Sequence, residues 1–101
     1  MIKVKILYWH DIPVQVKAED DEGRVGVQLS DRFQSAIDEA AMAANLIGDD
    51  DYTHGFHWEE VQGREGTASE VAGAVAAELE SKYTEIDWHS TARKIKENRQ
   101  R

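Results

Sequence analysis

The stretch IKVKILYWHDIPVQVKAEDDEGRVGVQL, residues 2–29, decides the fold class. Its first part alternates apolar residues with lysines and then becomes apolar on both sides as far as Trp9, which predicts a strand whose second half is buried. Two further alternating segments flank EDDEG, a sequence typical of turns, so residues 14–29 are predicted to form a β-hairpin.

The segment YWHDIPVQV, residues 8–16, joins the first strand to this hairpin. Proline fixes its own φ and restricts the residue before it, so Ile12–Pro13 predicts a rigid corner. Pro13 cannot donate a ladder hydrogen bond, and we expect it at the first residue or the edge of a strand. The corner holds Trp9 and His10 at one end of the sheet. A tryptophan in that position is either an interface anchor or a lid on the core, and the sequence leaves both open.

Two helices follow the hairpin. Ser30 is a candidate N-cap, and apolar residues recur at helical spacing over residues 33–44. The sequence TASE, residues 67–70, fits a capping box before a second apolar stripe over residues 71–83. Between them, FHWEEVQ (residues 56–62) predicts another strand.

Apolar residues over 86–95 predict a short third helix, and the basic residues 96–101 are expected to be a frayed tail. The chain has 101 residues, which predicts a single domain spanning residues 1–101. The order of elements predicts an α+β fold: a two-layer sandwich with a mostly antiparallel three- to four-stranded sheet, two main helices on one face and a short C-terminal helix.

Composition excludes several functions. The chain has 20 acidic and 12 basic residues and a net charge of −8, which disfavours nucleic-acid binding. It has no cysteine, so disulfides and thiolate chemistry are absent. It shows no targeting segment and no long apolar run, so we expect a cytoplasmic protein with no membrane contact. It also lacks a nucleophile elbow, a phosphate-binding loop and a dinucleotide fingerprint, so we expect no catalytic residues and no cofactor.

Five polar residues form a separate hypothesis. Tyr8, His10 and Asp11 could act in acid–base chemistry, because histidine titrates near neutrality. Asp38 lies next to the apolar stripe of the first helix and must face solvent or find a partner, and Arg32 could reach Asp11 across the fold. If all five converge, the chain is a small enzyme or a ligand-binding subunit. The alternative for Asp38 is a structural ion pair or hydrogen-bond network.

A metal site is the weaker alternative. His54 and His57 stand three residues apart beside the acidic run Asp49–Asp51. On a strand this spacing points the two histidines to opposite faces, and the run lacks the ligand spacing of a calcium loop. We therefore expect no metal.

The chain resembles the small bacterial domain family catalogued as virulence factor. That family shares the tyrosine–tryptophan start of the corner, the arginine–phenylalanine helix and the later tyrosine and tryptophan, here Tyr52 and Trp58. The chain departs from the pattern at His10, where the family usually has arginine, and at Glu59–Glu60. The resemblance implies no catalytic residue, and it implies a helper of folate- or corrinoid-dependent one-carbon enzymes. The positions that carry the first part of the resemblance are Tyr8, Trp9, Asp11, Ile12, Pro13, Gln15, Val16, Leu29, Arg32, Phe33, Ala36, Ile37, Asp38, Ala40, Ala41 and Met42.

The leading hypothesis is a non-enzymatic interaction or accessory module that binds another protein. It places Tyr8, Trp9, His10, Phe56 and Trp58 on the binding face, because aromatic residues held at a rigid corner are typical anchors. The sequence does not decide whether the chain also associates with itself.

Overall fold

The computed structural model describes residues 2–46 and 49–99. The predicted α+β class with an antiparallel sheet is confirmed, and the sheet has four strands. The elements follow in the order β1 (Ile2–Trp9), β2 (Ile12–Asp20), β3 (Gly23–Gln28), α1 (Asp31–Ala43), α2 (Asp49–Thr53), β4 (Phe56–Arg64), α3 (Ala68–Lys82) and α4 (Trp88–Arg99).

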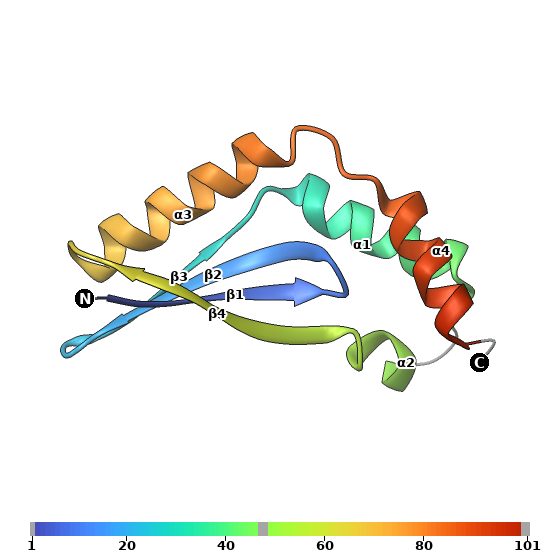
Figure 1. Cartoon of the computed structure of the whole chain (residues 1–101), viewed down its shortest axis with the longest axis horizontal. Helices are drawn as coiled ribbons and strands as arrows, with labels where there is room; N and C mark the ends of the chain where they lie inside the picture. The colour runs from blue at the N-terminus through green and yellow to red at the C-terminus, as the bar shows by residue number, and fades with distance from the viewer. Residues whose placement is uncertain (1, 47–48, 100–101) are drawn as a thin grey trace.

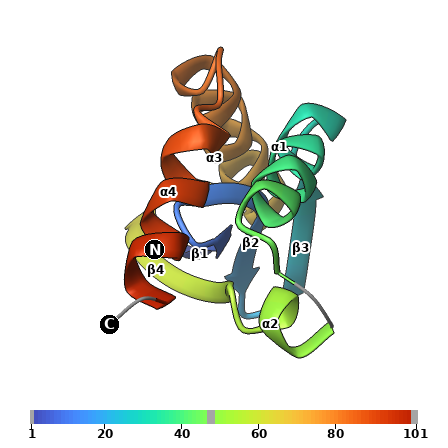
Figure 2. The ribbon, with the colours of Figure 1, turned by 90° about the vertical axis from the view of Figure 1, so that its right-hand side faces the viewer.

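The strands are ordered β3-β2-β1-β4, and each neighbouring pair is antiparallel. Figure 1 shows α1 and α3 along one face of this sheet. In Figure 2, α4 lies next to α1 at one end of the sheet. The short α2 lies at the same end.

A two-residue connection, His10 and Asp11, joins β1 directly to β2. His10 has a φ of 55°, the left-handed region in which tight hairpin turns place residues, and its N–H donates to the Gly55 carbonyl at 2.9 Å. The expectation for Pro13 is corrected, because Pro13 is the second residue of β2 and β2 is an interior strand. Its missing N–H is accommodated where the β1–β2 register shifts, next to Tyr8.

The predicted hairpin of β2 and β3 is confirmed. Its turn is closed by Asp20, whose Oδ1 accepts from the N–H groups of Glu22 at 2.8 Å and Gly23 at 2.9 Å. An aspartate that bonds backbone N–H groups ahead of it is a common way to start a turn. This turn fixes the register that puts Val25 and Val27 on the helix side of the sheet.

Alternation along the strands sends one set of side chains into the core beneath the helices. The alanine face of α3 permits a close approach to β2 and β3, because small side chains leave little bulk between helix and strand. Trp9 and Phe33 are the two largest fully buried side chains. The other core residues include Val4, Ile6, Ile12, Val14, Val16, Ala18, Ile37, Ala40, Ala72, Val75, Ala76, Leu79, Ala92 and Ile95.

The helix ends differ in how well the sequence predicts them. The capping box of α3 is confirmed: the Thr67 side chain accepts from the Glu70 N–H, and the Glu70 carboxylate accepts from the Thr67 N–H. Ser30 precedes α1, but its side chain makes no cap hydrogen bond. α4 has 12 residues and so includes residues 96–99 of the predicted tail, whereas residues 100 and 101 lie outside the described part.

Candidate functional site

Trp9 is a lid on the core. Its side chain is 0% exposed, and its indole N–H donates to the Tyr52 carbonyl at 2.8 Å. The rings of His10 and Tyr52 pack against it, with centroids 4.5 and 5.8 Å away. Of the two alternatives that the sequence leaves open for Trp9, the structure has the buried one.

Two of the other aromatic residues predicted for the binding face pack against neighbouring rings. Phe56 is half-buried and packs edge-on against Tyr52, with centroids 5.4 Å apart. Tyr8 is half-buried and stacks on His57 at 5.8 Å. Burial raises the pKa of the Tyr8 phenol, and Tyr83 and Glu59 add to the rise. Tyr8 therefore stays a neutral phenol near neutral pH.

The tight turn between β1 and β2 borders a cleft against α4. The cleft has a volume of about 320 Å³ and is lined by His10, Asp11, His57, Thr91 and Lys94, together with Ile95 and Asn98. We call it the corner cleft. It brings together three of the residues singled out from the sequence, His10, Asp11 and His57, with four residues of α4.

Asp11 is held firmly in this cleft. The buried Thr91 hydroxyl donates to its Oδ1, and Lys94 Nζ lies 3.1 Å from its Oδ2. These bonds fasten the N-terminal corner to the C-terminal helix. Burial lowers the pKa of the neighbouring His10, although the Asp11 carboxylate opposes the shift. His10 is therefore predominantly the neutral imidazole at pH 7.

Arg32 and Asp38 lie apart from the corner cleft. Arg32 donates to the Tyr83 carbonyl, to the Glu80 carbonyl at 2.8 Å and to the Glu80 carboxylate at 3.0 Å, which ties the start of α1 to the end of α3. The predicted meeting of Arg32 with Asp11 is therefore corrected, because each has other partners.

Asp38 is exposed. Its Oδ1 accepts from Gln34 Nε2 at 3.0 Å and from the Tyr52 hydroxyl at 3.3 Å. Asp38 therefore belongs to a structural hydrogen-bond network and not to an ion pair. The five polar residues do not converge on one pocket.

The metal hypothesis finds no support in the described residues. Over residues 2–46 and 49–99, no group of three or more histidine, aspartate or glutamate side chains is arranged to hold a metal ion. His57 instead lies 3.5 Å from the Glu59 carboxylate, and its Nδ1 lies 3.4 Å from the Gly55 carbonyl. The side chains of Asp49 and Asp51 lie outside the description.

The sheet face opposite α1 and α3 forms a second surface, which we call the open face. Its side chains come from the alternate strand positions that the core does not use. Residues directly opposite in an antiparallel pair share a face, so the pairing defines three rungs across the strands. The rungs are Lys3, Glu19 and Arg24; Glu60, Lys5, Lys17 and Gly26; and Trp58, Leu7, Gln15 and Gln28.

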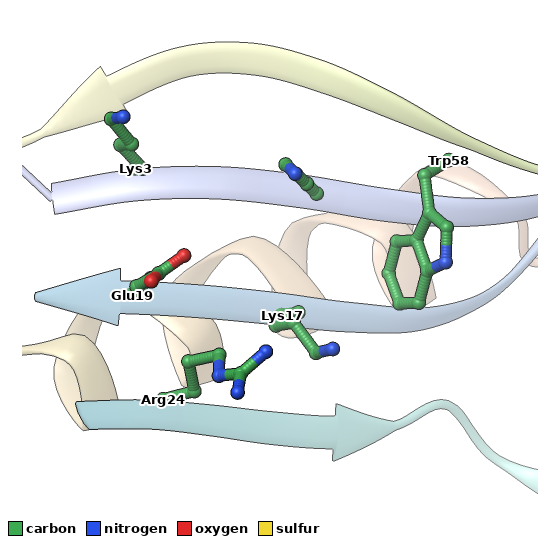
Figure 3. Close-up of a pocket in the computed structure, with 6 residues that line it drawn as sticks. Lys3, Lys17, Glu19, Arg24 and Trp58 are labelled. Atoms are coloured by element: carbon green, nitrogen blue, oxygen red, sulfur yellow. The ribbon is translucent and has the colours of Figure 1, made fainter.

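Trp58 is 43% exposed on this face. Lys17 Nζ lies over its ring, 5.0 Å from the centroid. Figure 3 shows Trp58, Lys17 and Arg24 in front of the strands, with the helices behind the sheet. Together with Lys3, Lys5 and Glu19, they line a hollow of about 130 Å³.

Among the described residues, the cations of the open face form no ion pair. Four ion pairs join described residues, and they use Arg32, Arg64, Lys94 and His57. None of them uses the open-face cations Lys3, Lys5, Lys17 and Arg24. The open face is therefore a basic, partly aromatic surface on an acidic chain.

A comparison with known protein families shows which family the chain belongs to. The family model described as "Virulence factor" matches residues 7–89, most of the chain. The chain belongs to the virulence factor family. Among curated proteins and among solved structures, nothing matches. The resemblance predicted from the corner and from the first helix is thereby confirmed.

In this virulence factor domain the match begins at Leu7, so Lys3 and Lys5 lie before it. The matched span includes the corner turn, α1 and Trp58, and it ends within α4. No helix over residues 2–46 and 49–99 is long and apolar enough to cross a membrane.

Sequence reasoning missed the basic residues of the open face. Strand alternation assigns Lys3, Lys5, Lys17 and Arg24 to the side away from the apolar residues. Adding up charges along that side would have revealed four cations in a chain of net charge −8. The signal was present, but it becomes visible only after the strands are ordered in the sheet.

Proposed function

We propose that this virulence factor domain is a cytoplasmic, non-enzymatic interaction module that binds another protein through its open face. The observation that carries the proposal is Trp58, a large aromatic side chain 43% exposed on a sheet face away from α1 and α3. Tryptophan is among the residues that contribute most binding energy at protein interfaces. Trp9, in contrast, is buried and serves the core.

The backbone beneath Trp58 supports this role. β4 is paired with β1, and Trp58 lies directly opposite Leu7, a half-buried apolar residue. An anchor on a paired strand loses little conformational freedom when a partner binds, because the strand is already ordered. The folate- or corrinoid-dependent one-carbon enzymes implied by the family resemblance are the first partners to test.

The test compares Trp58→Ala with Met42→Ala. Met42, on α1, is 68% exposed and is the other large exposed apolar residue of the described chain. Each purified variant is immobilised and offered a purified one-carbon enzyme and a host extract, and captured proteins are quantified. We expect a partner that wild type and Met42→Ala retain and that Trp58→Ala loses by about tenfold or more. Equal capture by the three proteins would refute binding through the open face.

The corner cleft supports a second candidate function, the binding of a small molecule. The supporting observation is the cleft of about 320 Å³, whose wall carries His10, His57 and Lys94. Clefts of this size with a few polar groups are the usual sites for small molecules. The test is a ligand screen followed by NMR. Shifts confined to residues near His10, His57 and Lys94, and lost in His10→Asn, would support the cleft, because asparagine tolerates the same backbone conformation.

A further inference from the structure

We infer that the open face recognises an acidic segment of its partner, with a side-chain carboxylate in the hollow between the cations, next to Trp58. The inference rests on the proposed function and specifies the chemistry of the partner. Four features of the open face carry it: its charge, the opposition of two lysines, the size of the hollow and the environment of the Trp58 ring.

The first feature is the sign of the charge. The cations Lys3, Lys5, Lys17 and Arg24 share the face with two carboxylates, Glu19 and Glu60, so the face is two charges positive. The whole chain has a net charge of −8. Surfaces with complementary potentials steer association and disfavour partners of the wrong sign. The positive open face therefore attracts an acidic segment, whereas the net negative charge of the rest of the chain repels it.

The second feature is internal repulsion. Lys5 lies directly opposite Lys17 in the β1–β2 register. Like charges placed directly opposite across strands destabilise a sheet. Neither ammonium group forms an ion pair with a described carboxylate, although Glu60 lies opposite Lys5 on the other side, in β4. A bound carboxylate between the two lysines would relieve the repulsion.

The third feature is size. The hollow of about 130 Å³ is smaller than the roughly 300–1,000 Å³ of sites that enclose a whole small molecule. It suits a single anionic group, such as a side-chain carboxylate. The remainder of the occupant must lie outside the hollow, across the sheet. This points to a segment of a larger partner.

The fourth feature separates an acidic peptide from single-stranded nucleic acid, the other polyanion that binds open sheets. Nucleic-acid readers of this kind stack bases on exposed aromatic rings. Here Lys17 Nζ lies over the Trp58 ring, so a stacking base would have to displace it. The acidic remainder of the chain also repels a long phosphate backbone. A short acidic segment avoids both conflicts.

The experiment titrates isotope-labelled chain with a peptide of two Glu-Glu-Leu-Gly repeats and follows amide shifts by NMR. Matched probes are the same peptide with glutamine for glutamate, and a short thymidine oligonucleotide. With the glutamate peptide we expect shifts in β1, β2 and β4, and a Kd that rises about fivefold or more between about 50 and about 300 mM salt. The glutamine peptide should produce no such shifts.

Variants locate the charges. The double variant Lys5→Gln with Lys17→Gln should raise the Kd about fivefold or more at low salt. The control double variant, Arg93→Gln with Lys96→Gln, removes the same charge from exposed positions of α4 and should leave the Kd within about twofold. Urea denaturation of each variant confirms folding.

Three results overturn the inference: absence of shifts with the glutamate peptide at low salt, equal weakening by the two double variants, or tighter binding of the oligonucleotide to the same strands. Failure here is distinguishable from failure of the proposed function. A partner captured in a Trp58-dependent but salt-insensitive manner would preserve the interaction module and remove the acidic segment.

Discussion

Lys5 of β1 and Lys17 of β2 face each other directly across the two central strands of the sheet. Lys5 also pairs in register with Glu60, and Lys17 lies over Trp58, so each lysine has a second neighbour of a different kind. The lysine pair is a local conflict inside an otherwise well-matched sheet. Its energetic cost can be measured separately from those second neighbours.

A double-mutant cycle of Lys5→Gln and Lys17→Gln makes this measurement. Either substitution removes the repulsion, so the double variant should gain less stability than the two single variants together, by about 0.2–1 kcal/mol. Urea denaturation at low salt gives the four free energies of unfolding. High salt should shrink the coupling. A coupling of opposite sign would mean that the pair is attractive and that the sheet carries no such conflict.

Gly55 tests the packing of the corner. A Cβ at this position would lie 2.5 Å from Trp9 Nε1 and 2.8 Å from His10 Nε2, so both rings would have to move. We expect Gly55→Ala to lower the free energy of unfolding by about 1–3 kcal/mol.

The control is Gly73→Ala. Gly73 is an exposed residue in the middle of α3, where an added Cβ meets no heavy atom within 4 Å. The substitution should raise the free energy of unfolding by about 0.5–1 kcal/mol, because alanine favours a helix over glycine. A stable Gly55→Ala variant would show that the two rings are not tightly held.

Asp11 and Asp38 should respond differently to substitution. Asp38 is exposed and bonds Gln34 and Tyr52, so Asp38→Ala should change the free energy of unfolding by about 0.5 kcal/mol or less. Asp11→Ala leaves the buried Thr91 hydroxyl without its acceptor and should cost about 1–3 kcal/mol. Asp11→Asn should recover part of this loss. A larger loss for Asp38→Ala would contradict the contacts in the structure.

Glu80 makes stability depend on pH. The Ser30 hydroxyl and N–H, at 2.8 Å each, and Arg32 hold the pKa of Glu80 below its ordinary value. A lowered pKa in the folded state adds stability above the ordinary pKa, and that stability is lost as pH falls through the lowered value.

Urea denaturation between about pH 6 and about pH 3 tests this. Glu80→Gln should flatten the acid side of the profile, whereas Glu39→Gln, at an exposed position of α1, serves as the control for removing one carboxylate. If both variants lose stability on acidification as steeply as wild type, Glu80 is not a source of the pH dependence.

Much of the fold could be predicted because local signals and packing agree. The alternation of Val4, Ile6 and the hairpin residues gives strands, and Thr67 with Glu70 gives the start of α3. Ser30 shows that a local sequence signal does not always decide which hydrogen bond a side chain makes. It has the right chemistry for a cap, but a carboxylate 50 residues later, on Glu80, takes its hydroxyl and N–H.

The candidate site was harder to predict. Trp9 and Trp58 both lie on strands, and nothing local distinguishes a buried tryptophan from an exposed one. The difference arises because Trp9 meets Tyr52 of α2 and Gly55 after it, whereas Trp58 lies on the open face. Strand alternation puts the lysines on the side away from the core, but their accumulation on one surface depends on the order β3-β2-β1-β4, which the sequence does not state.

The division of β1 between two faces has a consequence for which sequence changes this chain can tolerate. Val4 and Ile6 serve the core, while Lys3 and Lys5 serve the open face, and the two sets alternate residue by residue. Substitutions in one set leave the packing of the other unchanged, whereas inserting or deleting one residue would exchange them. Point mutation can therefore change the charge of the open face on a constant scaffold. A change of length in this strand would destroy both at once.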